Sequence, residues 1–430
     1  MRSIRVTAAV AFGAAALVAP GPAAAAARPV LPQQLGTAHV LVHYADSGTG
    51  AITAEAAQKV ADAAERGYAT YTGWGFRAPP SDGALGGDGR IDVYVVNAIQ
   101  STGREKEGLA VPDVPIGRPW AHIVLRAGVV GGYDQVVQHE LFHLVEFAYN
   151  ALESPFLLES NAEWASGGYT PSPAASYFLM PFAEQSLETT DPYLRWPFFT
   201  YLSARFGPGV MVDVWKTSEA LGVGKPHSLE AIAGAVAARG TTLAAVWNDY
   251  AAAQLQAADI AGSAGKLALV AGTTTQTLPA QTFSLPHLAI GFAAIRASTY
   301  DGVFRECTAA ERTGEGAVLH LRVELPAGSA SAPAVAVYEL GSAGTPMSVA
   351  KLTLAGGAAT IDIPHWRGCS LAELAVPNAS TTADEQYAVS ASVTGGVQPV
   401  TPPTTAPKAK PKPKPKPKPK PKHRRRGRKS

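Results

Sequence analysis

Hydrophobic positions recur with helical spacing between residues 136 and 145. One side of this segment is apolar and the rest is largely polar, a pattern typical of a helix with one buried face. Asp134 stands where an N-cap residue is expected. The segment is therefore predicted to be a helix held firmly against a core through Val136, Val137, Leu141, Leu144 and Val145.

The stretch before this helix predicts an α+β arrangement. Hydrophobic runs rich in β-branched residues indicate strands, and a longer run with helical spacing follows a capping threonine. The expected elements are a strand at 37–44, a helix at 53–71 capped by Thr53, a strand at 91–96 and a strand at 122–126. His39, His43 and His122 lie in these strands, where we expect them to pack or to face solvent.

From residue 168 to residue 256 the pattern is helical. Asp191 and Pro192 are expected to open a helix that Pro197 kinks and Gly207 ends. Further helices are predicted at 209–220, 229–238 and 242–256.

Residues 266–397 change character, because short β-branched runs alternate there with Gly, Pro and Ser clusters. This spacing predicts an antiparallel β-sandwich with strands at 317–324, 333–339, 348–354, 358–363 and 386–393. No cluster of catalytic residue types appears in this part. Its expected role is packing, substrate presentation or adhesion.

Both ends of the chain have a special composition. Residues 1–27 carry Arg2 and Arg5, then an apolar run and several A-x-A sites, which predicts a secretory signal peptide. Residues 398–430 are rich in Pro, Lys and Arg, which predicts a disordered basic tail. We expect an exported protein whose tail binds anionic cell-envelope polymers or lipid headgroups. Specific nucleic-acid recognition is not expected, because no folded base-reading motif appears.

Charge and cysteine content refine this picture. The tail from Lys408 holds 13 Lys or Arg, so the chain between signal and tail has 21 basic against 34 acidic residues and is clearly acidic. The two cysteines, Cys307 and Cys369, are expected to form a disulfide in an exported protein.

The helix predicted after Asp134 carries the sequence His139-Glu140-Leu141-Phe142-His143. Histidines four residues apart share one helix face, so both imidazoles can bind a single Zn2+. Glu140 is placed to take a proton from a water molecule on that ion. The segment thus holds two metal ligands and a general base for hydrolysis.

A second helix is predicted to follow, with Ser154 as N-cap and Pro155 as its first residue. It carries Glu159 and Glu163, which are four residues apart and on one face. A catalytic zinc site needs three protein ligands. Only one of these glutamates has to bind the metal, and the other can accept a hydrogen bond from a ligand histidine.

Together, HELFHLVEFAYN and LLESNAEWASGG resemble the gluzincin zinc metallopeptidases, and especially secreted bacterial metalloproteases with an HE[FL]FH motif. The resemblance implies a zincin-like domain over residues 28–265, with a mixed sheet, a helical lobe and one Zn2+ held by His139, His143 and Glu159. Glu163 would orient a histidine, although thermolysin-like spacing would choose Glu163 as the ligand. Ser160 stands where the family usually has Gly.

The same resemblance implies further roles. Residues 122–126 would form the edge strand beside the cleft, to which an extended peptide could add. Tyr193 and Tyr201 would be candidates for stabilising an oxyanion.

The sequence therefore predicts a secreted zinc-dependent metallopeptidase that cuts protein or peptide substrates. The alternative is a non-catalytic zincin-like protein that binds the cell envelope, and the intact Glu140 argues against it. A hydrolase acting on another class of substrate is also compatible with the zinc chemistry.

Overall fold

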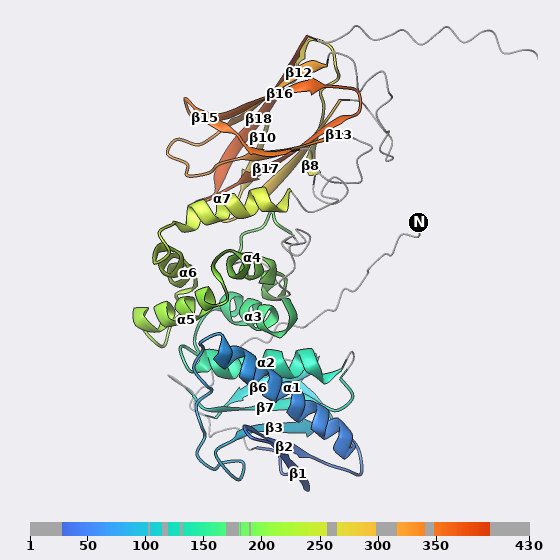
Figure 1. The fold of residues 1–430 in the computed structure, drawn as a ribbon, viewed down its shortest axis with the longest axis vertical. Helices are drawn as coiled ribbons and strands as arrows, with labels where there is room; N and C mark the ends of the chain where they lie inside the picture. Colours follow the sequence, from blue (N-terminus) through green and yellow to red (C-terminus); the bar gives the residue numbers. More distant parts are fainter. Residues whose placement is uncertain are drawn as a thin grey trace, which may run out of the picture.

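The structure is a computed structural model that describes residues 28–101, 104–113, 119–129, 132–168, 180, 182–188, 191–255, 265–297, 316–339 and 348–395. The predicted signal peptide (1–27) and basic tail (398–430) lie outside these residues. Figure 1 shows three successive layers along the long axis: a sheet with two helices, a group of helices, and a pair of sheets. The protein is thus a mixed α+β molecule with a β-sandwich-like part.

The N-terminal sheet has the strand order β1-β2-β3-β7-β6. The β2, β3 and β7 strands run parallel, whereas β1 and β6 are antiparallel to their neighbours. The strands are β1 Gln33–Gly36, β2 Val40–Tyr44, β3 Ile91–Val96, β6 Gly108–Pro112 and β7 Ala121–Arg126, with a separate hairpin of β4 Ile99–Ser101 and β5 Arg104–Lys106.

This order corrects one expectation from the sequence. The predicted strand at 122–126 is β7, but it lies inside the sheet between β3 and β6. The edge strand is β6, which the sequence analysis missed. Its five residues include a glycine and a proline and show no clear alternation of polar and apolar positions. A short edge strand of this kind gives little sequence signal.

Two helices cover one face of the sheet, α1 (Ala54–Gly73) and α2 (Tyr133–Phe147). The α1 helix begins as predicted, because the Thr53 side chain accepts a hydrogen bond from the Ala56 N–H. Alternate strand residues such as Val42, Val93 and Ile123 pack in one core with these helices. This core holds α2 in a fixed position.

The middle layer is helical, as the sequence predicts. One difference is that Asp191 and Pro192 do not open a long kinked helix: they open a 3-10 turn, and a separate helix starts at Trp196, so Pro197 lies in its first turn. The elements are α3 Pro155–Glu163, the π-helical turn Trp164–Gly168, the 3-10 turn Pro192–Leu194, α4 Trp196–Phe206, α5 Gly209–Leu221, α6 Ser228–Ala237 and α7 Leu243–Gln254.

Two sheets with the orders β10-β18-β12-β16-β15 and β14-β13-β17-β11-β8 enclose a second core. This part is β-sandwich-like, but β8 and β11 are parallel, so the predicted antiparallel arrangement is not complete. The strands are β8 Gly265–Val270, β9 Gln276–Thr277, β10 Gln281–Leu285, β11 Ile290–Arg296, β12 Ala317–Glu324, β13 Ala334–Glu339, β14 Ser348–Lys351, β15 Thr353–Ala355, β16 Ala358–Trp366, β17 Ser370–Pro377 and β18 Glu385–Thr394.

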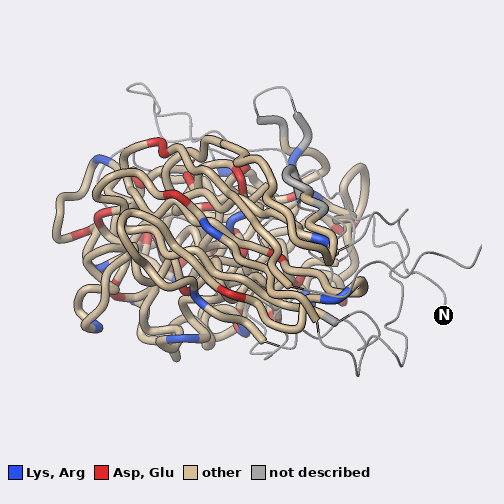
Figure 2. Tube along the Cα trace, turned by 90° about the horizontal axis from the view of Figure 1, so that it is seen from above, with Lys and Arg blue, Asp and Glu red and all other residues tan. Residues whose placement is uncertain are grey.

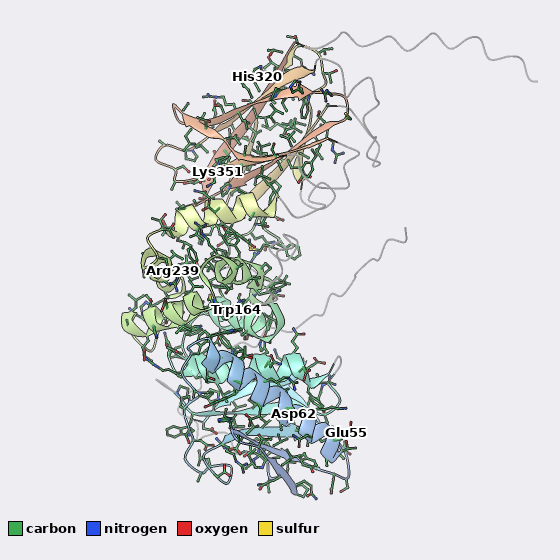
Figure 3. All side chains as sticks on the ribbon, viewed as in Figure 1. Glu55, Asp62, Trp164, Arg239, His320 and Lys351 are labelled. Atoms are coloured by element: carbon green, nitrogen blue, oxygen red, sulfur yellow. The ribbon has the colours of Figure 1, made fainter. Side chains whose placement is uncertain are left out.

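The sandwich is joined to the helices by a shared core. Residues of its second sheet, including Ile290, Ala336 and Leu371, belong to the same buried cluster as the helical layer. Asn248 on α7 donates to the Ala330 carbonyl and accepts from the Ala332 N–H. Figure 3 labels Lys351 where the sandwich meets α7. The two parts therefore form one continuous packed body.

Cys369 is disulfide-bonded, while its predicted partner Cys307 lies outside the described residues. Among the helices that the structure describes, none combines the length and apolar character needed to cross a bilayer. Figure 2 shows acidic and basic residues interspersed along the described chain.

Candidate metal centre

The first part of the site is α2, which presents His139, Glu140 and His143 from its buried positions. The helix begins at Tyr133, after Gly132 with a φ of 101°. The expected N-cap role of Asp134 is wrong, because Asp134 lies inside the first turn and its carboxylate accepts a hydrogen bond from Arg66 at 2.6 Å. A glycine in this conformation lets the chain turn sharply into the helix without a side-chain cap.

The second part is α3, which starts as the sequence predicts. The Ser154 hydroxyl accepts from the Leu157 N–H at 3.3 Å, and Pro155 is the first helical residue. At the other end of α3, Trp164 packs on Trp74 of the α1 C-terminus with ring centroids 4.8 Å apart. Figure 3 shows Trp164 where the helical layer meets the layer below. These contacts fix the face of α3 that carries Glu159.

Three side chains from the two helices meet at one point. The Nε2 atoms of His139 and His143 are 3.1 Å apart, and Glu159 Oε2 lies 3.2 Å from the first and 3.5 Å from the second. All three residues are buried. The structure therefore brings together the three ligands that the resemblance implies, and they come from segments that are 16 or more residues apart.

The spacing of these donors fits a zinc ion. With metal–donor distances of about 2.0–2.1 Å in a tetrahedral shell, donors lie about 3.3–3.4 Å apart. The three observed separations, 3.1, 3.2 and 3.5 Å, are close to this value. Two imidazoles and one carboxylate are also the donor set of many catalytic zinc sites. The residues present could therefore hold a metal ion such as Zn2+.

Each histidine has a carboxylate on its other ring nitrogen. Glu163 Oε1 lies 3.2 Å from His139 Nδ1, and Glu146 Oε2 lies 2.7 Å from His143 Nδ1. A carboxylate in this position accepts the Nδ1–H and leaves the Nε2 lone pair free for a metal. Glu163 thus takes the orienting position that the sequence analysis assigned to it.

Glu146 was missed in the sequence analysis. It is fully buried and follows His143 by three residues on α2. The sequence contains a signal for this contact: residues three apart on a helix are neighbours, so Glu146 can reach His143. A glutamate on the buried side of a helix also needs a partner.

Glu140 points toward the edge strand β6. The main chain of Ala110 donates a hydrogen bond to its carboxylate, and a Cβ on Gly108 would lie 2.7 Å from Glu140 Cγ and Oε1. The absence of a side chain at Gly108 therefore makes room for Glu140. The edge strand fixes the carboxylate beside the two histidines.

Burial governs the charge states at this site. Burial raises the pKa of Glu140, although the charges of His139 and His143 oppose the effect. Burial also raises the pKa of Glu146 to about 8. For Glu159, burial is outweighed by hydrogen bonds from His139 and His143, which lower its pKa. Four glutamates thus surround two histidines: the contacts with both imidazoles favour the charged form of Glu159, whereas burial favours the neutral forms of Glu140 and Glu146.

The two candidate tyrosines differ in position. The Tyr193 ring stacks on His139 with centroids 5.8 Å apart and an interplanar angle of 17°. Its turn is tied to α3 because Ser160 Oγ donates to the Pro192 carbonyl at 2.5 Å. Tyr201 contacts Arg205 and Tyr250 on α4 and α7. Of the two, Tyr193 is the one that the structure places beside the candidate ligands.

Comparison with known proteins adds little to this geometry. No family model matches the chain, and no curated protein matches it. One similar solved structure is the pre-peptidase C-terminal domain of a collagenase from Bacillus anthracis, at 12% identity and a TM-score of 0.19. That match covers 29% of this chain and 93% of the other. At this level of similarity, the match has no bearing on how the site works.

Proposed function

We propose that the protein is a zinc-dependent metallopeptidase with a zincin-like part over residues 28–265. The observation that carries the proposal is the triangle of His139 Nε2, His143 Nε2 and Glu159 Oε2, whose sides of 3.1, 3.2 and 3.5 Å suit one Zn2+. An acid placed for proton transfer, Glu140, lies next to the first of these ligands on the same helix.

Zn2+ bound there would supply a Lewis acid and make a water molecule more acidic. Glu140 takes the proton of the attacking water, because its carboxylate is held near the histidines by the Ala110 N–H. Its burial raises its pKa and so makes it a stronger base than an exposed glutamate. The same carboxyl group can then hand the proton to the leaving amine.

The edge strand supplies a binding surface for an extended chain. The Glu107 carbonyl accepts from the Arg126 N–H at 2.9 Å, so Leu109 and Val111 turn their main-chain groups toward β7. By alternation, the main-chain groups of Gly108 and the carbonyl groups of Ala110 and Pro112 point away from β7, to the side of β6 where the described residues form no further strand of this sheet. A peptide that pairs there lies next to Glu140. This supports a protein or peptide substrate over other hydrolysable compounds.

Tyr193 is proposed to stabilise negative charge on the carbonyl oxygen that is attacked. Its position on the ring of His139 supports this role. We also propose that the protein is secreted and that its tail, residues 398–430, binds anionic envelope polymers or headgroups, because the sequence shows a signal-like start and a basic end.

The test combines metal analysis with digestion of a peptide library by the purified protein. Glu140→Gln should keep one zinc per chain and lose cleavage, because the amide cannot accept a proton. Equal cleavage by the wild type and this variant would reject the mechanism. Glu159→Ala should lose zinc while Glu163→Ala keeps most of it, and the reverse result would make Glu163 the ligand.

The second candidate function is that of a non-catalytic envelope-binding protein with the same fold. The sandwich and the basic tail favour it. Wild-type protein that carries no zinc after purification without chelators, but binds envelope material reversibly with salt, would support this alternative.

A further inference from the structure

A second buried polar cluster lies on the face of the N-terminal sheet that points away from α2. Strand residues alternate between the two faces: Val93 and Val95 pack in the core with the helices, so Asp92 and Tyr94 point to the opposite face. Asp92, Asp113, His43 and His122 are all nearly inaccessible to solvent. This cluster is therefore separate from the candidate metal centre.

One guanidinium group, that of Arg28, contacts three carboxylates in this cluster. Its Nε and Nη2 atoms donate to the two oxygens of Asp113 at 3.2 and 2.5 Å. Its Nη1 atom lies 2.5 Å from Asp82 Oδ2 and also donates to Asp92. The carboxylates come from separate segments: the loop before β3, β3 itself, and the residue after β6. Their arrangement matches the planar fork of a guanidinium.

Other groups hold the three carboxylates in this arrangement. His43 Nε2 lies 2.7 Å from Asp92 Oδ1, and His122 Nδ1 lies 3.0 Å from Asp113 Oδ1. The loop that carries Asp82 passes directly over Asp92, since a Cβ on Gly86 would lie 1.9 Å from Asp92 Oδ2. The site is therefore built by the fold, and the arginine enters it from the N-terminal end of the described chain.

The cluster needs a cation. Burial alone would raise the pKa of Asp113, but hydrogen bonds from His122 and Arg28 keep it below its ordinary value. Asp82 Oδ1 is buried and has no hydrogen-bond partner among the described residues. Three buried carboxylates contact the same guanidinium, so they would lose their shared partner if that group were removed.

We propose that Asp82, Asp92 and Asp113 form a guanidinium-binding site whose resident ligand is the side chain of Arg28. The fold then depends on a residue that directly follows the predicted signal peptide. Every A-x-A site within residues 23–27 leaves Arg28 in the exported chain. Processing that removed Arg28 would empty the site, so the mature chain must begin at or before this residue.

The test compares melting temperatures of the full mature chain. Arg28→Ala should lower the Tm by about 5 °C or more, because buried carboxylates lose their partner. Arg66→Ala is the matched control: it also removes a guanidinium from an aspartate, Asp134, but at an exposed pair, and should change the Tm by about 1 °C at most. Equal Tm values for the wild type and Arg28→Ala would overturn the proposal.

Chemical rescue then tests the ligand class. Millimolar methylguanidinium should raise the Tm of Arg28→Ala in a saturable way, and methylammonium should do so much less, because it lacks the planar fork. Neither compound should raise the Tm of the wild type or of the double variant Arg28→Ala, Asp113→Asn. If Arg28→Ala does not fold, the yield of refolding from urea with each compound is the readout. Absence of rescue by methylguanidinium in both measurements overturns the proposal.

Two independent results bear on the same site. Arg28→Lys restores the charge but not the fork, so its Tm should lie between those of Arg28→Ala and the wild type, and a wild-type Tm would contradict recognition of a guanidinium. The mass of the exported protein should place its N-terminus at or before residue 28. A mature chain that begins after residue 28 and melts like the longer one would also contradict the proposal.

Discussion

Individual residues in the candidate metal centre act in pairs. Each histidine that faces the candidate metal position has a glutamate behind it, Glu163 for His139 and Glu146 for His143. The contact between Glu146 and His143 is the shorter one, with Glu146 Oε2 2.7 Å from the ring nitrogen Nδ1, and Glu146 has no exposed surface. Orientation of His143 therefore depends on one glutamate that lies on the same helix.

Removing this glutamate should weaken metal binding. We expect Glu146→Ala to lower the zinc affinity by about 10–100-fold, measured by competition with a fluorescent chelator. Glu146→Gln should lose less, because its amide oxygen can still accept the Nδ1–H of His143. Glu55→Gln, at an exposed pair with Lys59, is the control. Unchanged affinity in Glu146→Ala would show that His143 is oriented by other contacts.

At the residue scale, the sequence pointed to glutamates outside the His139–His143 motif as well as to the motif itself. The helical spacing of Glu159 and Glu163 puts both on one face, so one could bind the metal and the other could accept a hydrogen bond from a ligand histidine. That Glu163 is the one beside His139 was implied only by the resemblance to gluzincins. The choice between them as metal ligand depends on how far α3 lies from α2, and the loop between the helices sets that distance. The spacing of residues along a chain does not give such a distance.

Among the elements, the contact between α2 and β6 matters most for the proposed chemistry. Gly108 at the start of β6 leaves space for the side chain of Glu140, and Val136 of α2 also lies within 2.8 Å of the position of a Cβ there. The distance between helix and edge strand thus depends on the absence of one side chain.

Gly108→Ala should therefore keep zinc and lose activity. The added methyl group would push Glu140 away from its position, and a displacement of about 1 Å can cost about 100-fold in rate. We expect kcat to fall by about 10-fold or more, with the zinc content unchanged. Gly209→Ala is the control, because nothing lies within 4 Å of its Cβ position. Wild-type kcat in Gly108→Ala would mean that the helix and strand can separate freely.

Elements with a strong periodic pattern were predicted well. The helix at 53–71 is α1, and those at 209–220, 229–238 and 242–256 are α5, α6 and α7 with small shifts at their ends. Strands β1, β4, β5 and β6, the strands β8 to β11 and β17 were not predicted. Pairing of strands is set by contacts between distant segments, so neither the edge position nor the parallel pair of β8 and β11 is readable from local patterns.

The whole molecule is held together by α7, which packs between the helical layer and the sandwich (Figure 1). On its surface, Asp249 accepts from Arg205 of α4 at 2.7 Å and pairs with Lys351 of β14. Burial would raise the pKa of Asp249, but hydrogen bonds from Lys351 and Arg205 lower it. The folded state therefore favours the charged form of this group.

This gives a pH dependence with a definite sign. A carboxyl group whose pKa is lowered in the folded state stabilises the fold at pH values above its unfolded pKa of about 3.9. This contribution is lost as the pH falls through the folded pKa. Asp249→Asn should lower the Tm at pH 7, and the difference from the wild type should shrink below about pH 4. Asp62→Asn, at an exposed pair with Gln58, is the control. A difference that grows in acid would contradict this assignment.

The shared core also predicts how the chain unfolds. Leu288, Ile290 and Leu371 of the sandwich are buried in one cluster with the helices, so neither part can open without exposing apolar surface of the other. Scanning calorimetry of the full chain should show one cooperative transition that includes both parts. Two transitions separated by about 10 °C or more would mean that the sandwich is stable alone.

Strand β17 is covered on both sides, since all eight of its residues are buried. One side faces the interior of the sandwich and the other faces α7. The outer face of this strand is therefore buried within the molecule. The outward face of the opposite sheet differs, because positions of β12 such as Arg322 and Glu324 are exposed to solvent.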